Sequence, residues 1–161
     1  MTNRRYVEIS AEESFLRRSA FTTFALGTLF LLEFFYQQIQ NGVKTNDFVL
    51  PLIMALGVLS FVAMLAGFVS SLSIGSKMRK RSFLGFTYDD EYLNYVAKTA
   101  SAISSYAIYF VLGLTYIATK EHLDTTWQIS LSLNEYTKLA LAIMSLAYAS
   151  PIFFLLWKKD E

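Results

Sequence analysis

Glu33 is the residue best placed for chemistry in this sequence, because it is the one acid well inside a long apolar stretch. Placing an ionisable side chain in hydrocarbon costs about 3 kcal/mol on insertion scales, so such a residue usually has a function or a bonding partner. Gln37 follows one helical turn later and is within reach of a hydrogen bond. Two interpretations are open: a structural carboxyl group bonded to Tyr, Thr or Gln on a neighbouring helix, or a site for a proton, a cation or a partner.

Tyr106 and Tyr109 are further polar side chains that lie deep within an apolar stretch. A buried tyrosine hydroxyl usually finds a hydrogen-bond partner. We therefore expect both side chains to point into the interior of a helix bundle, where they are the natural companions of other polar groups.

The sequence contains none of the common catalytic signatures. It has no G-x-x-x-x-G-K-[ST], H-E-x-x-H or G-x-S-x-G pattern. The absence of Cys excludes thiolate chemistry, and a single His excludes clustered imidazole sites. We therefore expect no catalytic residue, no bound metal and no cofactor.

The elements that position these residues are four long apolar stretches. Hydrophobic residues make up 54% of the 161 residues and charged residues 17%, whereas soluble domains average roughly 45–50% and about 25%. A helix needs roughly 20 apolar residues to cross a bilayer, and four stretches reach this length, at about 19–39, 48–74, 97–119 and 135–157. The expected fold is all-α, with one four-helix transmembrane bundle built from two helical hairpins.

Lys and Arg are distributed unevenly around these stretches. Eleven of the fourteen lie before the first, near the loop between the second and third, or after the fourth. By the positive-inside rule, both termini and this middle loop face the cytoplasm. We therefore expect a multi-pass protein of a bacterial cytoplasmic (inner) membrane. The eleven residues are Arg4, Arg5, Arg17, Arg18, Lys77, Arg79, Lys80, Arg81, Lys98, Lys158 and Lys159.

Two helix starts are expected on the cytoplasmic side. Ser10 and Glu13 have the spacing of a capping box, which predicts that the first helix begins near Ala11. The acids of Asp89-Asp90-Glu91 favour the positive end of a helix dipole, so a second helix should begin there. These patterns predict short amphipathic lead-ins near 11–18 and 89–96.

Two further groups of residues indicate contact surfaces. Small residues recur every fourth position in the second stretch, at Ala63, Gly67, Ser71 and Gly75, which lets another helix approach closely. That helix belongs either to the same chain or to a partner or second copy. The basic residues Arg17, Arg18, Lys77, Arg79, Lys80 and Arg81 predict contact with anionic lipid headgroups or with a protein partner.

The class of function that fits these observations is binding within a membrane. We expect a non-catalytic protein that acts through helix–helix contacts, as an accessory subunit, an immunity-type protein or a sensor of a membrane complex. The partner is either another protein or a second copy of the chain in a homo-oligomer. A net charge of +1 gives no reason to expect nucleic acid as a partner. The alternative is an oligomeric small transporter or channel in which Glu33 couples to a proton or cation.

Overall fold

The computed structural model describes residues 2–40, 48–75, 78, 87–119 and 132–160, and it describes side chains within 9–40, 48–75, 78, 87–116 and 132–158. In this part of the chain every regular element is an α-helix. The helices are α1 (Thr2–Gln40), α2 (Val49–Gly75), α4 (Glu91–Thr119) and α5 (Leu133–Asp160). The all-α expectation is confirmed.

Three of these helices are long and apolar enough to cross a membrane. The candidate spans are Ile9–Gln40, Val49–Gly75 and Leu133–Lys158, and they contain or closely match the expected stretches 19–39, 48–74 and 135–157. With 29 residues, α4 is longer than α2 and α5, but it carries Lys98 and many Ser, Thr and Tyr side chains and is not in this set. The crossing expected at 97–119 therefore stays a prediction.

The two expected helix starts differ in outcome. α1 begins at Thr2, so the predicted start near Ala11 is wrong. Ser10 lies inside the helix, and the Glu13 carboxylate accepts hydrogen bonds from Arg17, one turn later, at 2.9 and 3.1 Å. α4 begins at Glu91, within the predicted group of acids. Asp90 acts as its N-cap, because its Oδ1 atom accepts a hydrogen bond from the Leu93 amide at 2.9 Å. Both expected lead-ins, near 11–18 and 89–96, are continuous with the long helices that follow them.

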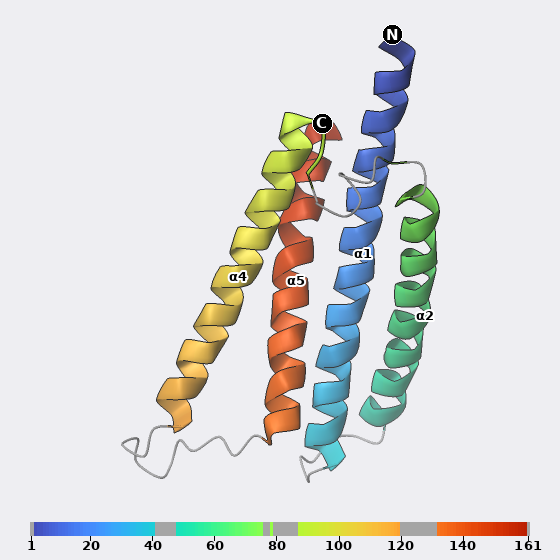
Figure 1. The fold of residues 1–161 in the computed structure, drawn as a ribbon. Helices are drawn as coiled ribbons and strands as arrows, with labels where there is room; N and C mark the ends of the chain where they lie inside the picture. Colours follow the sequence, from blue (N-terminus) through green and yellow to red (C-terminus); the bar gives the residue numbers. More distant parts are fainter. Residues whose placement is uncertain (1, 41–47, 76–77, 79–86, 120–131, 161) are drawn as a thin grey trace.

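The helices stand side by side in the order α4, α5, α1, α2 (Figure 1). Helices α1 and α5 pack against each other at the centre, while α2 packs on α1 and α4 packs on α5 at the two edges. Each sequence-adjacent pair is thus a hairpin of neighbours, but α2 and α4 do not pack together. The arrangement is an open row, and the expected four-helix transmembrane bundle stays a prediction. The two chain termini lie at the same end of the helices, which we call the terminal end of the row.

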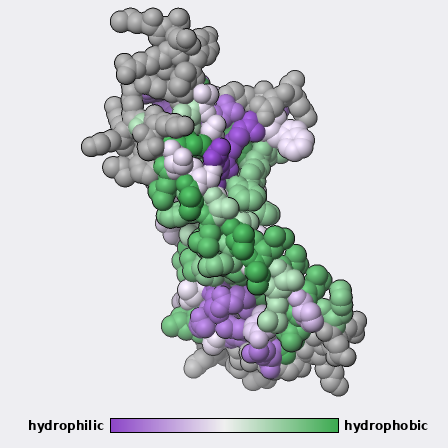
Figure 2. Space-filling model, turned by 90° about the vertical axis from the view of Figure 1, so that its right-hand side faces the viewer, coloured by the Kyte–Doolittle hydropathy of each residue, from purple (hydrophilic) through white to green (hydrophobic). Residues whose placement is uncertain are grey.

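The apolar core lies between the helices at the terminal end of the row. Leu16 of α1, Leu93 of α4 and Ile152 of α5 are fully buried there. Towards the middle of the row, α1 and α5 approach closely at Gly27, where a Cβ atom would lie 2.9 Å from the Ser145 Cβ. Seen from the α2 edge, hydrophobic residues form a band across the middle, and hydrophilic residues gather above and below it (Figure 2).

Candidate binding surface

Helix α4 packs on α5 through a single narrow stripe. Ala100, Ser104 and Val111 are buried on this stripe, and the Ser104 hydroxyl donates to the Met144 carbonyl oxygen at 3.0 Å. The remaining faces of α4 beyond Ala100 are mostly exposed. One edge of the row is therefore a helix whose other faces are unpartnered in a single copy of the described chain.

The face of α4 opposite this stripe carries tyrosines and small residues at regular intervals. A helix turns 100° per residue, so positions spaced by 7, 4, 3, 4 and 3 fall on one face. All six positions with this spacing are exposed, and a Cβ atom on Gly113 would meet nothing within 4 Å. We call these six residues the tyrosine seam: Tyr95, Ala102, Tyr106, Tyr109, Gly113 and Tyr116.

The tyrosine seam overturns one expectation about side-chain placement. Tyr106 and Tyr109 were expected to point into a bundle, yet they are 73% and 69% exposed. The cause is the open row, since α4 packs mainly on α5 and its stripe of Ala, Ser and Val occupies that side. Within the described chain, neither hydroxyl has a hydrogen-bond partner.

Glu33 has a partner that sequence reasoning missed. Its Oε1 atom accepts a hydrogen bond from Lys138 Nζ of α5 at 2.5 Å, which makes an ion pair between the two central helices. The Glu33 side chain is 47% exposed and that of Lys138 is 12% exposed. Pairing with an opposite charge is the usual arrangement of an ionisable residue within a membrane. The carboxylate bonds across the row instead of along its own helix to Gln37.

Gln37 and Gln38 have different environments at this end of α1. Gln37 Oε1 is buried and lacks a partner in the described part of the chain. Gln38 Nε2 donates to Glu135 Oε1 at 2.8 Å. Glu135 is buried and also accepts from the amide and hydroxyl of Ser132, at 2.7 and 2.6 Å, so it closes a capping box at the start of α5. The spacing of Ser132 and Glu135 in the sequence is the signal that could have identified this contact.

A shallow groove of about 260 Å³ lies beside Glu33 between α1 and α2. Apart from Glu33 and Tyr36, its described lining is apolar. The groove therefore offers one carboxylate and hydrocarbon surface. The lining residues are Leu29, Leu32, Glu33, Tyr36, Ile53, Met54, Gly57 and Val58.

The small-residue stripe of α2 faces α1 of the same chain. Gly67, Ser71 and Gly75 are buried, and Ala63 is half-buried. A Cβ atom on Gly67 would lie 2.4 Å from the Thr22 Oγ1 atom of α1. Of the two interpretations of this stripe, the structure shows packing within the chain.

The two described members of the predicted basic group, Arg17 and Arg18, make contacts within the chain. Arg17 pairs with Glu13 and also donates to the Leu156 carbonyl oxygen at 3.3 Å. Arg18 donates to the Ser70 hydroxyl of α2. The other members of the predicted basic group, Lys77, Arg79, Lys80 and Arg81, lie outside the described residues.

A polar contact that the sequence did not reveal holds the start of α4. The buried Glu12 carboxylate of α1 accepts the Asp89 amide at 3.0 Å, and the Asn94 side chain bonds both backbone groups of Tyr88. Burial raises the pKa of the Tyr88 hydroxyl well above its usual range, and the neighbouring Tyr148 and Glu12 add to this effect. The hydroxyl is buried and has no partner within the described residues.

The described side chains contain no group of three or more His, Cys, Asp or Glu residues that could hold a metal ion. No protein-family model matches the chain, and comparisons with curated proteins and with solved structures find no match.

Proposed function

We propose that the chain is a four-span protein of a bacterial cytoplasmic membrane that acts without catalysis, by docking a helix on the tyrosine seam of α4. Both termini and the loop between α2 and α4 face the cytoplasm in this proposal. It is supported by the charge asymmetry, because eleven of fourteen Lys and Arg residues belong to that side.

The exposure of Tyr106 and Tyr109 carries the proposal. Both residues lie near the middle of the expected span 97–119. In this proposal that part of α4 lies in hydrocarbon, which offers their hydroxyls no water. A polar group in hydrocarbon is destabilising unless it is hydrogen-bonded, and polar side chains on such helices commonly bond across to another helix. A second helix on the seam would satisfy both hydroxyls.

The spacing of the seam supports the same conclusion. Alternating steps of four and three residues are the repeat with which two helices pack side by side over many turns. Ala102 and Gly113 leave room for close approach, and the intervening tyrosines supply contact area. This surface suits an accessory subunit, an immunity-type protein or a sensor equally well, and it suits a second copy of the chain.

The transporter alternative draws less support from the site. It depends on a carboxylate that is free to exchange a proton or a cation, and the Glu33 carboxylate is paired with Lys138. The pair neutralises both charges between the central helices. It supports a structural role for Glu33, with Lys138 in place of the Tyr, Thr or Gln partner expected from the sequence.

Photo-crosslinking in intact membranes tests the proposal. A photoreactive phenylalanine analogue replaces Tyr106 on the seam, and in a matched variant it replaces Val62, which is exposed on α2 among apolar neighbours. We expect the probe at position 106 to form a discrete protein adduct and the probe at position 62 to react with lipid. Mass spectrometry of the adduct distinguishes a second copy from another protein.

The adduct must also depend on the seam. Introducing Gly113→Leu places a large side chain on the docking face and should abolish the adduct at position 106, while the chain stays inserted. Lipid adducts alone at both positions, or a protein adduct that Gly113→Leu leaves intact, would contradict the proposal.

A further inference from the structure

We propose that a hollow on α5, at the terminal end of the row, binds one phospholipid with an anionic headgroup. The described residues that line the hollow are Phe153, Phe154, Trp157 and Lys158, and its volume is about 520 Å³. It shares no residue with the tyrosine seam, so this inference is independent of the proposed function.

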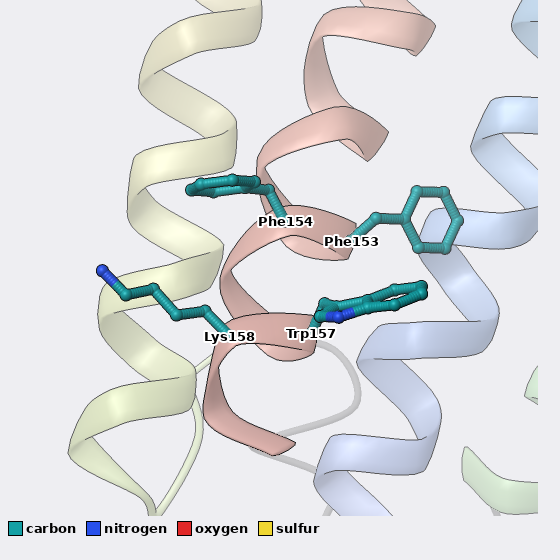
Figure 3. A pocket seen from close by; sticks show the side chains of 4 residues that line it. All are labelled: Phe153, Phe154, Trp157 and Lys158. Carbon is teal, nitrogen blue, oxygen red and sulfur yellow. The ribbon is translucent and has the colours of Figure 1, made fainter. Parts of the chain in front are cut away.

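The hollow is a recess over the exposed face of α5, flanked by its two neighbours (Figure 3). Phe153 and Trp157 point towards α1, whereas Phe154 and Lys158 point towards α4. The Phe153 ring meets Phe24 of α1 edge to face, with ring centroids 6.0 Å apart, which closes one side of the recess. Its volume falls in the range of roughly 300–1,000 Å³ that is usual for sites of small molecules.

The lining is graded in polarity along the membrane normal. The span of α5 ends at Lys158, and Phe153 precedes it by five residues, so the ring lies about 7 Å deeper at 1.5 Å per residue. Trp157 sits at the level where indole rings favour the boundary between headgroups and acyl chains. Aromatic rings thus lie at acyl-chain depth and an ammonium group at phosphate depth, which is the polarity of a phospholipid.

Charge selects an anionic lipid for this site. Lys158 is exposed, and no carboxylate within the described residues pairs with it. Arg17 reaches the same end of α5 through its bond to the Leu156 carbonyl oxygen, although Glu13 balances its charge. The net positive charge at the mouth therefore comes from Lys158, and it complements a headgroup with one uncompensated phosphate.

Quenching of Trp157 fluorescence by brominated lipids tests this site in the full chain. The sequence contains two tryptophans, so Trp127→Phe leaves Trp157 as the single reporter. The protein is reconstituted in phosphatidylcholine vesicles that contain an equal mole fraction of either brominated phosphatidylglycerol or brominated phosphatidylcholine. We expect phosphatidylglycerol to be enriched beside Trp157 by about fivefold, the equivalent of about 1 kcal/mol for one Lys near the surface.

Two charge-matched variants separate a site from a general surface potential. Lys158→Gln should remove the enrichment, and Lys98→Gln, which deletes an equal charge from an exposed position on α4, should retain it. Phe154→Ala should weaken quenching by both lipids, and circular dichroism confirms that each variant keeps its helices. Equal quenching by the two lipids, an equal loss in Lys98→Gln, or protection of Trp157 from both lipids by a protein contact would overturn the proposal.

Discussion

The two edge helices of the row, α2 and α4, expose different types of residue. Both pack on one neighbour through small residues and leave their other faces exposed. The exposed residues of α2 are mainly Leu, Val, Met and Phe, and it is a candidate membrane span; those of α4 include four tyrosines and Lys98, and α4 is not. Lipid chains suit the first surface, whereas they would leave the Tyr106 and Tyr109 hydroxyls of the second without partners.

The difference shows that exposure has two meanings in a membrane. An exposed leucine on α2 is in its preferred solvent, so it indicates no partner. In the proposed four-span arrangement, an exposed tyrosine near the centre of α4 would lie in lipid, so there it would indicate a missing neighbour. The type of residue that is exposed is therefore more informative than the exposed area.

The largest expected effect comes from glycine substitutions on the two edges. Gly67→Leu forces a side chain into the Thr22 contact between α2 and α1, and overpacking of this kind destabilises by about 3 kcal/mol. Gly113→Leu meets open space on α4, so we expect stability to be unchanged or raised by up to about 1 kcal/mol through helix propensity. Unfolding titrations in mixed micelles measure both. Equal destabilisation would mean that α4 is packed within one copy on its seam side too.

A smaller effect is expected from the ion pair that joins the centre of the row. In a double-mutant cycle, Glu33→Gln and Lys138→Gln should show a coupling of about 1 kcal/mol, because Glu33 is half-exposed. Vesicles containing Glu33→Gln should match the wild type in proton and cation flux. A proton or cation flux that the wild type supports and Glu33→Gln abolishes would support the transporter alternative. It would contradict the proposal that the protein acts by docking a helix on the tyrosine seam.

The smallest effect concerns pH at the start of α4. Because the folded-state pKa of Tyr88 is raised, its contribution to stability is complete below the unfolded-state value near 10 and is lost as pH rises towards the folded-state pKa. Alkaline unfolding followed by circular dichroism should therefore be less steep in Tyr88→Phe than in the wild type. Lack of a difference would indicate that the Tyr88 hydroxyl ionises as readily as an exposed one.

Much of the fold is predictable from local sequence patterns. The ends of α2 agree with the predicted stretch to within one residue, because no charged residue interrupts the sequence from Val49 to Gly75. The acids at 89–91 correctly mark the start of α4. The start of α1 is missed because the capping-box pattern at Ser10 is also compatible with a helix interior, where Glu13 bonds forward to Arg17.

The candidate site is less predictable, because it depends on which helix lies beside which. Glu33 stands out as an intramembrane acid, but Lys138 is 105 positions away and becomes its partner through the contact of α1 with α5. The spacing of the tyrosine seam is visible in the sequence. That it faces away from the row is not, because the buried stripe of Ala100 and Ser104 is nearly as regular.

The contact between α1 and α5 at Gly27 has a consequence for biosynthesis. It joins α1 to α5, which follows α2 and α4 in the described chain, so this interface closes only after α5 has been synthesised and inserted. Until then the newly made hairpin of α1 and α2 exposes Gly27 and Glu33 to lipid without Ser145 and Lys138 opposite them. Insertion of α5 is therefore the step that completes the row of described helices.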